Sequence, residues 1–207
     1  MSEQLNFKHK YVPSSDPPKG KTVLLLHGTG GNEESLIPIV EMVLPDAAIL
    51  SPRGQIMENG MPRFFRRIAE GVFDLEDLKF QTQELAIFIE AASKTYGIES
   101  NEVIALGYSN GANIASSVML TYPELISKAA LFHPMIPFVP ENPPDLSNTG
   151  ILITAGTNDP IVSREETLEL NNMFQDYGAE VEIFWHDSEH NLTREELDKT
   201  KNFLSES

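Results

Sequence analysis

One serine of this chain stands in a pattern that is typical of an enzymatic nucleophile. Ser109 is the centre of the run 107–111, GYSNG, which matches the G-x-S-x-G pattern of a nucleophile elbow. An apolar stretch, 103–106, leads into the run, and a stretch rich in small residues, 112–120, follows it. This strand–turn–helix context favours an exposed nucleophile over the ordinary alternative, in which Ser109 simply caps a helix.

A nucleophilic serine needs a base and a group that orients the base. Asp159 lies in the loop after the apolar run 151–155, and His190 lies between the last expected strand and the last expected helix. Taken singly, Asp159 could cap a turn and His190 could be a solvated loop residue. Their joint occurrence with Ser109, in an order known for serine hydrolases and each after a strand, predicts a Ser-His-Asp triad.

Other histidines and aspartates are weaker candidates. His186 is expected to end the last strand, and His133 is interpreted as a structural or pocket-wall residue. The remaining alternatives are Asp187, which would need an unusual geometry, Asp145, which precedes its strand, and His9, which lies in the polar N-terminal stretch.

A glycine-rich loop follows the apolar run 22–26 and reads HGTGG from His27 to Gly31. Glycines let the backbone approach a substrate and direct N–H groups toward it. We expect the backbone amides of Thr29 and Asn110 to form an oxyanion hole. Phosphate binding is the competing interpretation, but the loop lacks both the P-loop ending and the dinucleotide spacing.

Apolar runs alternate with amphipathic segments along the whole chain, which predicts an α/β fold with a mostly parallel sheet covered by helices on both faces. We expect one domain, 1–207, because no repeat or boundary is evident. The expected strands are 22–26, 47–50, 103–106, 128–132, 151–155 and 181–185, with 5–12 as an antiparallel edge strand. Helices are expected at 75–96, ending at Gly97, at 112–120, and after the capping boxes that begin at Ser163 and Thr193.

Composition limits the classes of function. The 207 residues include 41% hydrophobic residues, which is enough for a substantial core, and the formal charge is −16. Such acidity disfavours nucleic acid and anionic membrane surfaces as partners. The chain lacks cysteine and a long apolar run, and its residues 1–11 are polar, so no secretory leader is expected. We therefore expect a cytoplasmic protein without disulfides, thiolate metal sites or a membrane span.

Four motifs taken together resemble the phospholipase/carboxylesterase family of serine hydrolases, and especially its small bacterial carboxylesterases of the hydroquinone-inducible hydrolase type. These motifs are LLLHGTGG, SPRG, GYSNGAN and AGTNDP. The resemblance runs from about Val23 to Phe203 and implies a compact α/β-hydrolase fold without a large cap domain. It also implies hydrolysis of carboxylic esters by Ser109, His190 and Asp159, with no metal or other cofactor. A homodimer is a further expectation from the family.

One residue departs from the family pattern. Glu189 stands where the family often has glycine before the catalytic histidine, and a second carboxylate there would be expected to raise the pKa of His190. A thioesterase or lysophospholipase of the same fold and a non-catalytic binding protein are the alternative functions. The complete triad argues against the last of these.

The long connection 52–74 is the segment expected to select the substrate. Phe64, Phe65, Arg67 and the more distant Met135 are the candidate substrate contacts. Together with Arg63 and Arg66, Arg67 could bind a substrate carboxylate or other anion. Ion pairing with surface carboxylates is the equally simple alternative. A short, open pocket for a small ester is expected.

Overall fold

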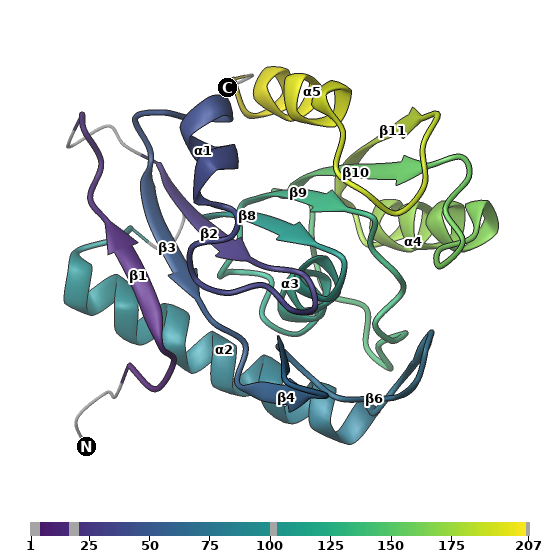
Figure 1. Ribbon diagram of the computed structural model, residues 1–207, viewed down its shortest axis with the longest axis horizontal. Helices are drawn as coiled ribbons and strands as arrows, with labels where there is room; N and C mark the ends of the chain where they lie inside the picture. Colours follow the sequence, from purple (N-terminus) through teal and green to yellow (C-terminus); the bar gives the residue numbers. More distant parts are fainter. Residues whose placement is uncertain (1–4, 17–20, 100–102, 206–207) are drawn as a thin grey trace.

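The computed structural model describes residues 5–16, 21–99 and 103–205. Its centre is a seven-stranded sheet in the order β1-β3-β2-β8-β9-β10-β11 (Figure 1). Strand β1 pairs antiparallel with β3, and every other neighbouring pair is parallel. The strands are β1 (His9–Val12), β2 (Thr22–Leu26), β3 (Ala48–Pro52), β8 (Val103–Tyr108), β9 (Lys128–Phe132), β10 (Gly150–Gly156) and β11 (Glu180–His186).

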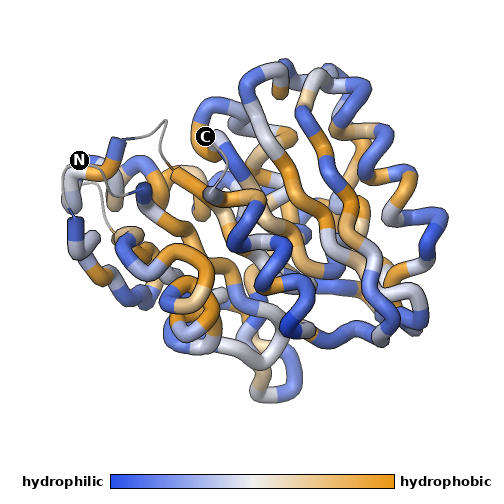
Figure 2. The backbone as a smooth tube through the Cα atoms, turned by 90° about the horizontal axis from the view of Figure 1, so that it is seen from above, coloured by the Kyte–Doolittle hydropathy of each residue, from blue (hydrophilic) through white to orange (hydrophobic). Residues whose placement is uncertain are grey.

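Helices cover both faces of this sheet, as its apolar strands require. Helices α2 (Leu75–Tyr96), α3 (Asn110–Thr121) and α4 (Arg164–Asp176) contribute to one buried cluster. Helices α1 (Ile37–Val43) and α5 (Arg194–Ser205) contribute to a second cluster on the opposite face. Figure 2 shows the result: apolar strands lie inside, and the outer helices turn hydrophilic residues to the surface. The predicted α/β fold, with its mostly parallel sheet, is confirmed.

Local capping explains where the long helices begin and end. The Asp74 side chain accepts a hydrogen bond from the Asp77 amide at the start of α2, and Gly97 ends the helix with φ 68°. Ser163 accepts from the Glu166 amide at the start of α4. Both ends of α2 and the start of α4 are therefore where the sequence predicts them.

The connection 52–74 contains structure that the sequence interpretation did not include. Strands β4 (Ile56–Glu58) and β5 (Met61–Arg63) form one small ladder, and β6 (Arg67–Ala69) and β7 (Val72–Phe73) form another. The first ladder turns at Asn59-Gly60, where both residues have positive φ. An Asn-Gly pair is a strong hairpin signal, so the sequence did contain a cue for this turn. The seven-residue helix α1 was also not predicted.

Among the described ranges, no helix is long and apolar enough to cross a bilayer.

Two glycines allow the tight passage from β8 into α3. A Cβ on Gly107 would lie 2.7 Å from the Ala112 Cα, and a Cβ on Gly111 would overlap the backbone carbonyl oxygen of Leu26. Backbone atoms cannot move aside as a flexible side chain can. The sheet and α3 can therefore approach this closely only if both positions remain glycine.

Replacing Gly111 with alanine tests this packing. Because the added Cβ overlaps backbone of the adjacent strand, we expect the free energy of unfolding to fall by about 1–3 kcal/mol or more. Gly150→Ala is the control, since its Cβ would meet only atoms at 3.6 Å or beyond. Thermal and denaturant unfolding of both variants measure the difference. Equal midpoints for the two variants would contradict the packing argument.

Candidate active site

Ser109 occupies a strained turn between β8 and α3. Its backbone has φ 52° and ψ −114°, a conformation that is rare for a residue with a side chain. The Ser109 amide donates to the Phe132 carbonyl of the neighbouring strand, over 2.9 Å, which holds the turn against the sheet. The serine side chain makes no capping bond to the helix and lines a surface pocket instead. This is the geometry of a nucleophile elbow.

The three residues of the predicted triad meet at the carboxyl ends of the strands. His190 Nε2 lies 2.8 Å from Ser109 Oγ, and His190 Nδ1 lies 2.7 Å from Asp159 Oδ2. Since an ionised carboxylate can only accept, Nδ1 carries the proton and Nε2 is left to accept from the serine. The Asp159 side chain is itself fixed by the amides of Ile161 and Val162, which donate to Oδ1 over 2.8 and 3.1 Å.

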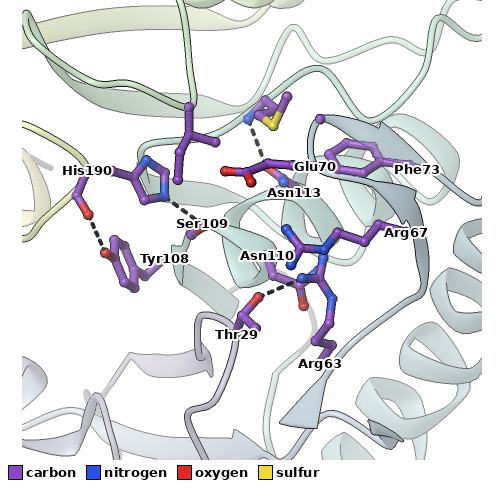
Figure 3. A pocket seen from close by; sticks show the side chains of 13 residues that line it. Thr29, Arg63, Arg67, Glu70, Phe73, Tyr108, Ser109, Asn110, Asn113 and His190 are labelled. Atoms are coloured by element: carbon purple, nitrogen blue, oxygen red, sulfur yellow. Dashed lines mark hydrogen bonds between the residues drawn. The ribbon is translucent and has the colours of Figure 1, made fainter. Parts of the chain in front are cut away.

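The loop that carries His190 is tied back to the elbow. The Tyr108 hydroxyl donates to the His190 carbonyl oxygen over 2.8 Å (Figure 3). Tyr108 precedes the nucleophile in sequence, so one strand end supports both the serine and the histidine. The sequence interpretation did not assign this tyrosine a role.

A second imidazole approaches the same carboxylate. His133 Nδ1 lies 2.9 Å from Asp159 Oδ2, so this ring nitrogen is also a donor. His133 is 1% exposed, follows β9 and has φ 52°. It is therefore a structural residue behind the site rather than part of the pocket wall.

A second buried carboxylate lies behind His133. His133 Nε2 is 3.2 Å from Glu196 Oε1, which is an ion-pairing distance although the ring N–H is not aligned for a hydrogen bond. Glu196 also accepts from the Thr154 hydroxyl over 2.6 Å and from the Thr193 amide over 2.7 Å. Sequence reasoning identified Glu196 only as the capping-box residue of α5.

Burial and neighbouring charges together shift the pKa values of these groups. Burial lowers the pKa of His190, and the nearby positive charge of His133 lowers it further, so that the attraction of Asp159 does not restore the ordinary value. Burial also disfavours a charged His133, but Glu196 and Asp159 together raise its pKa. The pKa of Asp159 is lowered in spite of burial, because the Ile161 amide and the two imidazoles donate to it.

Glu189 does not act on His190 as expected from the sequence. Its side chain is exposed, and the pKa of His190 is lowered rather than raised. The carboxylates that act on the imidazole are the buried ones of Asp159 and Glu196. An exposed carboxylate is screened by water, which explains why adjacency in sequence overstates its effect.

The other histidines and aspartates considered from the sequence lie outside the triad. His186 ends β11, as predicted, and its Nε2 is 3.3 Å from Glu196 Oε1. Asp187 accepts from Asn158, Asp145 accepts from the Ser147 amide, and His9 pairs with the Tyr96 hydroxyl.

Two groups of described residues have ligand atoms close enough to hold a metal ion: His133, His186 and Glu196, and His133, Asp159 and His190. The second group contains the side chains that reach Ser109, where a metal would compete with the serine for His190. The first group is fully buried. In this group the Nε2 atoms of His133 and His186 both lie near one carboxylate oxygen, Glu196 Oε1, at 3.2 and 3.3 Å.

The glycine-rich loop lies beside the serine and is held firmly. The buried His27 ring contacts the Gly28 carbonyl through Nδ1 and accepts from the Gly54 amide at Nε2 over 3.0 Å. Burial lowers the pKa of His27, which keeps this ring neutral and able to accept. Thr29 and Asn110 both line the pocket next to Ser109. The Asn110 amide begins α3, where backbone N–H groups have no acceptor within the helix.

The pocket has a volume of about 320 Å³ and combines apolar and charged walls (Figure 3). Its apolar lining includes Phe73, Met135 and Ile161, and its charged lining includes Arg63, Arg67 and Glu70. Asn113 Oδ1 accepts from the Met135 amide over 2.7 Å and so places this part of the wall.

Of the four substrate contacts expected from the sequence, Arg67 and Met135 line the pocket. Phe64 and Phe65 do not: they are 1% and 0% exposed and belong to the core cluster beneath the site. This corrects the expectation for both phenylalanines. The Phe64 backbone still matters, because its amide donates to Asn110 Oδ1 over 2.7 Å.

Comparison with known proteins shows the family and the fold of this chain. A family model described as Phospholipase/Carboxylesterase matches residues 7–207. MhqD of Bacillus subtilis (strain 168) is 44% identical over 199 residues, which cover 96% of this chain and 98% of that protein. The crystal structure of the Bacillus cereus carboxylesterase is 44% identical and superposes with a TM-score of 0.94, covering 97% of this chain and 94% of the other.

A third relative is more distant. The structure of YahD with malic acid is 33% identical and has a TM-score of 0.89, covering 95% of this chain and 98% of the other. The family model and these structures show that the chain is an α/β-hydrolase that belongs to the phospholipase/carboxylesterase family.

Proposed function

We propose that this protein hydrolyses carboxylic esters of small molecules with Ser109 as nucleophile, His190 as general base and Asp159 as the residue that orients the base. The continuous chain of contacts from Ser109 Oγ through His190 to Asp159 carries the proposal. The similarity to the Bacillus cereus carboxylesterase supports it.

In the first half of the reaction, Ser109 Oγ attacks the ester carbonyl carbon and passes its proton to His190 Nε2. Asp159 stabilises the imidazolium and keeps Nδ1 protonated throughout. The negative charge that develops on the carbonyl oxygen is accepted by the backbone amides of Thr29 and Asn110. Each such donor contributes roughly 3 kcal/mol in comparable enzymes. His190 then protonates the leaving alcohol, and the acyl group remains on Ser109.

Water completes the cycle. His190 removes a proton from a water molecule as its oxygen attacks the acyl carbon, and the proton is returned to Ser109 Oγ when the acid departs. The chemistry of both halves needs only side chains and backbone amides that lie around the pocket. The pocket opens to the surface, so water can reach the acyl group.

The size of the pocket favours short substrates. A volume of about 320 Å³ is at the small end of the range for ligand sites. A long acyl chain would need an apolar groove that continues from the wall of Phe73 and Met135. In this pocket the charged residues Arg67 and Glu70 border that wall instead. This favours an esterase over a lysophospholipase. A thioesterase with a small acyl group uses the same residues and is the second candidate.

Ser109→Ala should abolish turnover. Without the nucleophile, hydrolysis of p-nitrophenyl acetate should fall by at least about a thousandfold, and labelling by a fluorophosphonate probe should disappear. Ser205→Ala, which changes an exposed serine at the end of α5, is the control and should retain both. Persistent labelling of Ser109→Ala would place the nucleophile elsewhere. Failure of the wild type to label or to hydrolyse the ester would favour a non-catalytic binding protein.

A series of p-nitrophenyl esters tests the pocket size. We expect kcat/KM to decrease steeply beyond butyrate, because longer chains cannot be enclosed by the cavity. The matching S-acyl thioesters, measured on the same enzyme, separate the esterase from the thioesterase. A preference for decanoate or longer chains would contradict the short pocket. Because YahD was solved with malic acid, dicarboxylic acids belong among the inhibitors tested.

The charge of His133 should affect the pH profile. His190 must be neutral to act as a base, and its pKa is lowered, so kcat/KM should reach half its maximum below pH 6.5. His133→Asn keeps an N–H donor for Asp159 and tolerates positive φ, but it removes the charge. The pKa of His190 should then rise, and the acid limb should move to higher pH. His9→Asn is the control, and an unmoved limb in His133→Asn would refute the electrostatic role.

A further inference from the structure

Two arginines line the pocket of a chain whose formal charge is −16. We propose, on the basis of the proposed esterase function, that Arg67 binds a carboxylate of the substrate, so that the preferred substrate is a short ester with one negative charge. The structure separates the arginine that supports the site from the arginine that is left to bind a ligand.

Arg63 is the supporting arginine. It is 4% exposed, and its Nη1 donates to the Thr29 hydroxyl over 2.9 Å and to Glu58 over 3.2 Å. Its Nε donates to the Phe65 carbonyl over 3.2 Å. These bonds connect the β4–β5 hairpin to the glycine-rich loop, so the positive charge of Arg63 is used to position the loop beside Ser109.

Arg67 is oriented differently. Its Nε donates to both carboxylate oxygens of Glu58, over 3.0 and 3.1 Å, which holds the side chain in place from behind. Within the described part of the chain, no partner is recorded for its two terminal nitrogens. Figure 3 shows the guanidinium directed toward the interior of the pocket. The two Nη groups form a planar fork that matches a carboxylate.

The remaining charges of the pocket restrict the ligand further. Glu58 pairs with both guanidinium groups, so these three groups together carry one positive charge. Glu70 is exposed on the pocket wall and has no ion pair with Arg67 among the described residues. Its carboxylate repels a second anionic group. The pocket therefore suits an ester that carries one carboxylate, such as the half-ester of a short dicarboxylic acid.

Water is the only co-reactant that hydrolysis of such a substrate requires. Monomethyl glutarate plus water gives methanol and glutaric acid: the acyl–oxygen bond breaks, and a new acyl–oxygen bond forms to water. Arg67 holds the free carboxylate while Ser109 attacks the ester at the other end. A cavity of about 320 Å³ limits the separation between these two groups to a few carbon atoms.

Binding of glutarate and butyrate, measured by isothermal titration calorimetry, tests the proposal without requiring turnover. Butyrate can place its single carboxylate either on Arg67 or near Ser109, whereas glutarate has two carboxylates and can occupy both places at once. We expect glutarate to bind the wild type at least about tenfold more tightly than butyrate, because a charge-assisted hydrogen bond is gained. This preference should decrease as salt is added, since Arg67 is 30% exposed at the side chain.

Four variants locate the effect. Arg67→Gln should remove most of the preference for glutarate, and Arg67→Lys should keep part of it, because the charge remains without the fork. Glu70→Gln should increase the preference, since a repelling carboxylate is lost. Arg66→Gln is the matched control: it makes the same change of charge at the preceding residue, which is exposed and outside the pocket lining. It should leave the preference unchanged.

Turnover gives a second readout of the same site. The ratio of kcat/KM for monomethyl glutarate to that for methyl butyrate should follow the binding preference across these variants. Equal binding of glutarate and butyrate by the wild type, or an equal loss of preference in Arg67→Gln and Arg66→Gln, would overturn the proposal. In that case the enzyme should still hydrolyse p-nitrophenyl acetate. If p-nitrophenyl acetate were not hydrolysed at all, that would instead count against the esterase function. Binding of glutarate would still report on Arg67.

Discussion

The buried carboxylate of Asp159 is the interaction on which the rest of the site depends. One of its oxygens is shared by His190 and His133, and the other accepts two backbone amides of its own loop. A carboxylate removed from water is stable only when such donors surround it. Because the donors come from loops after different strands, satisfying Asp159 fixes these loops relative to one another. The position of His190 beside Ser109 follows from that constraint.

The second carboxylate, Glu196, connects this site to the stability of the fold. It caps the start of α5 through Thr193, accepts from Thr154 on β10, and faces His133 at ion-pairing distance. A capping residue is usually a local feature of one helix. Here it is buried against the sheet, so the same side chain orders the C-terminal helix and stabilises positive charge on His133. The charge of His133 is one of the causes that lower the pKa of His190, whereas the Glu196 carboxylate itself acts to raise it.

The two small hairpins in the connection 52–74 build the other side of the pocket. Glu58 on β4 orients two arginines, one toward the glycine-rich loop and one toward the pocket. The sheet thus positions Ser109, His190 and Asp159, while the hairpins provide the charged wall. The charged wall and the strand ends that position Ser109, Asp159 and His190 therefore come from different parts of the chain.

The sequence by itself determined the features that depend on neighbouring residues. Local features of this kind are the strand periodicity, the caps of α2 and α4, and the glycines around Ser109. The family motifs added the prediction that Ser109, Asp159 and His190 form a triad. Only the tertiary structure decided which groups meet across the fold. Phe64 and Phe65 are part of the core although their neighbours line the pocket, and the buried Glu196, rather than the adjacent Glu189, acts on the histidines. Burial and charge pairing arise between residues far apart in the chain, so no local pattern reveals them.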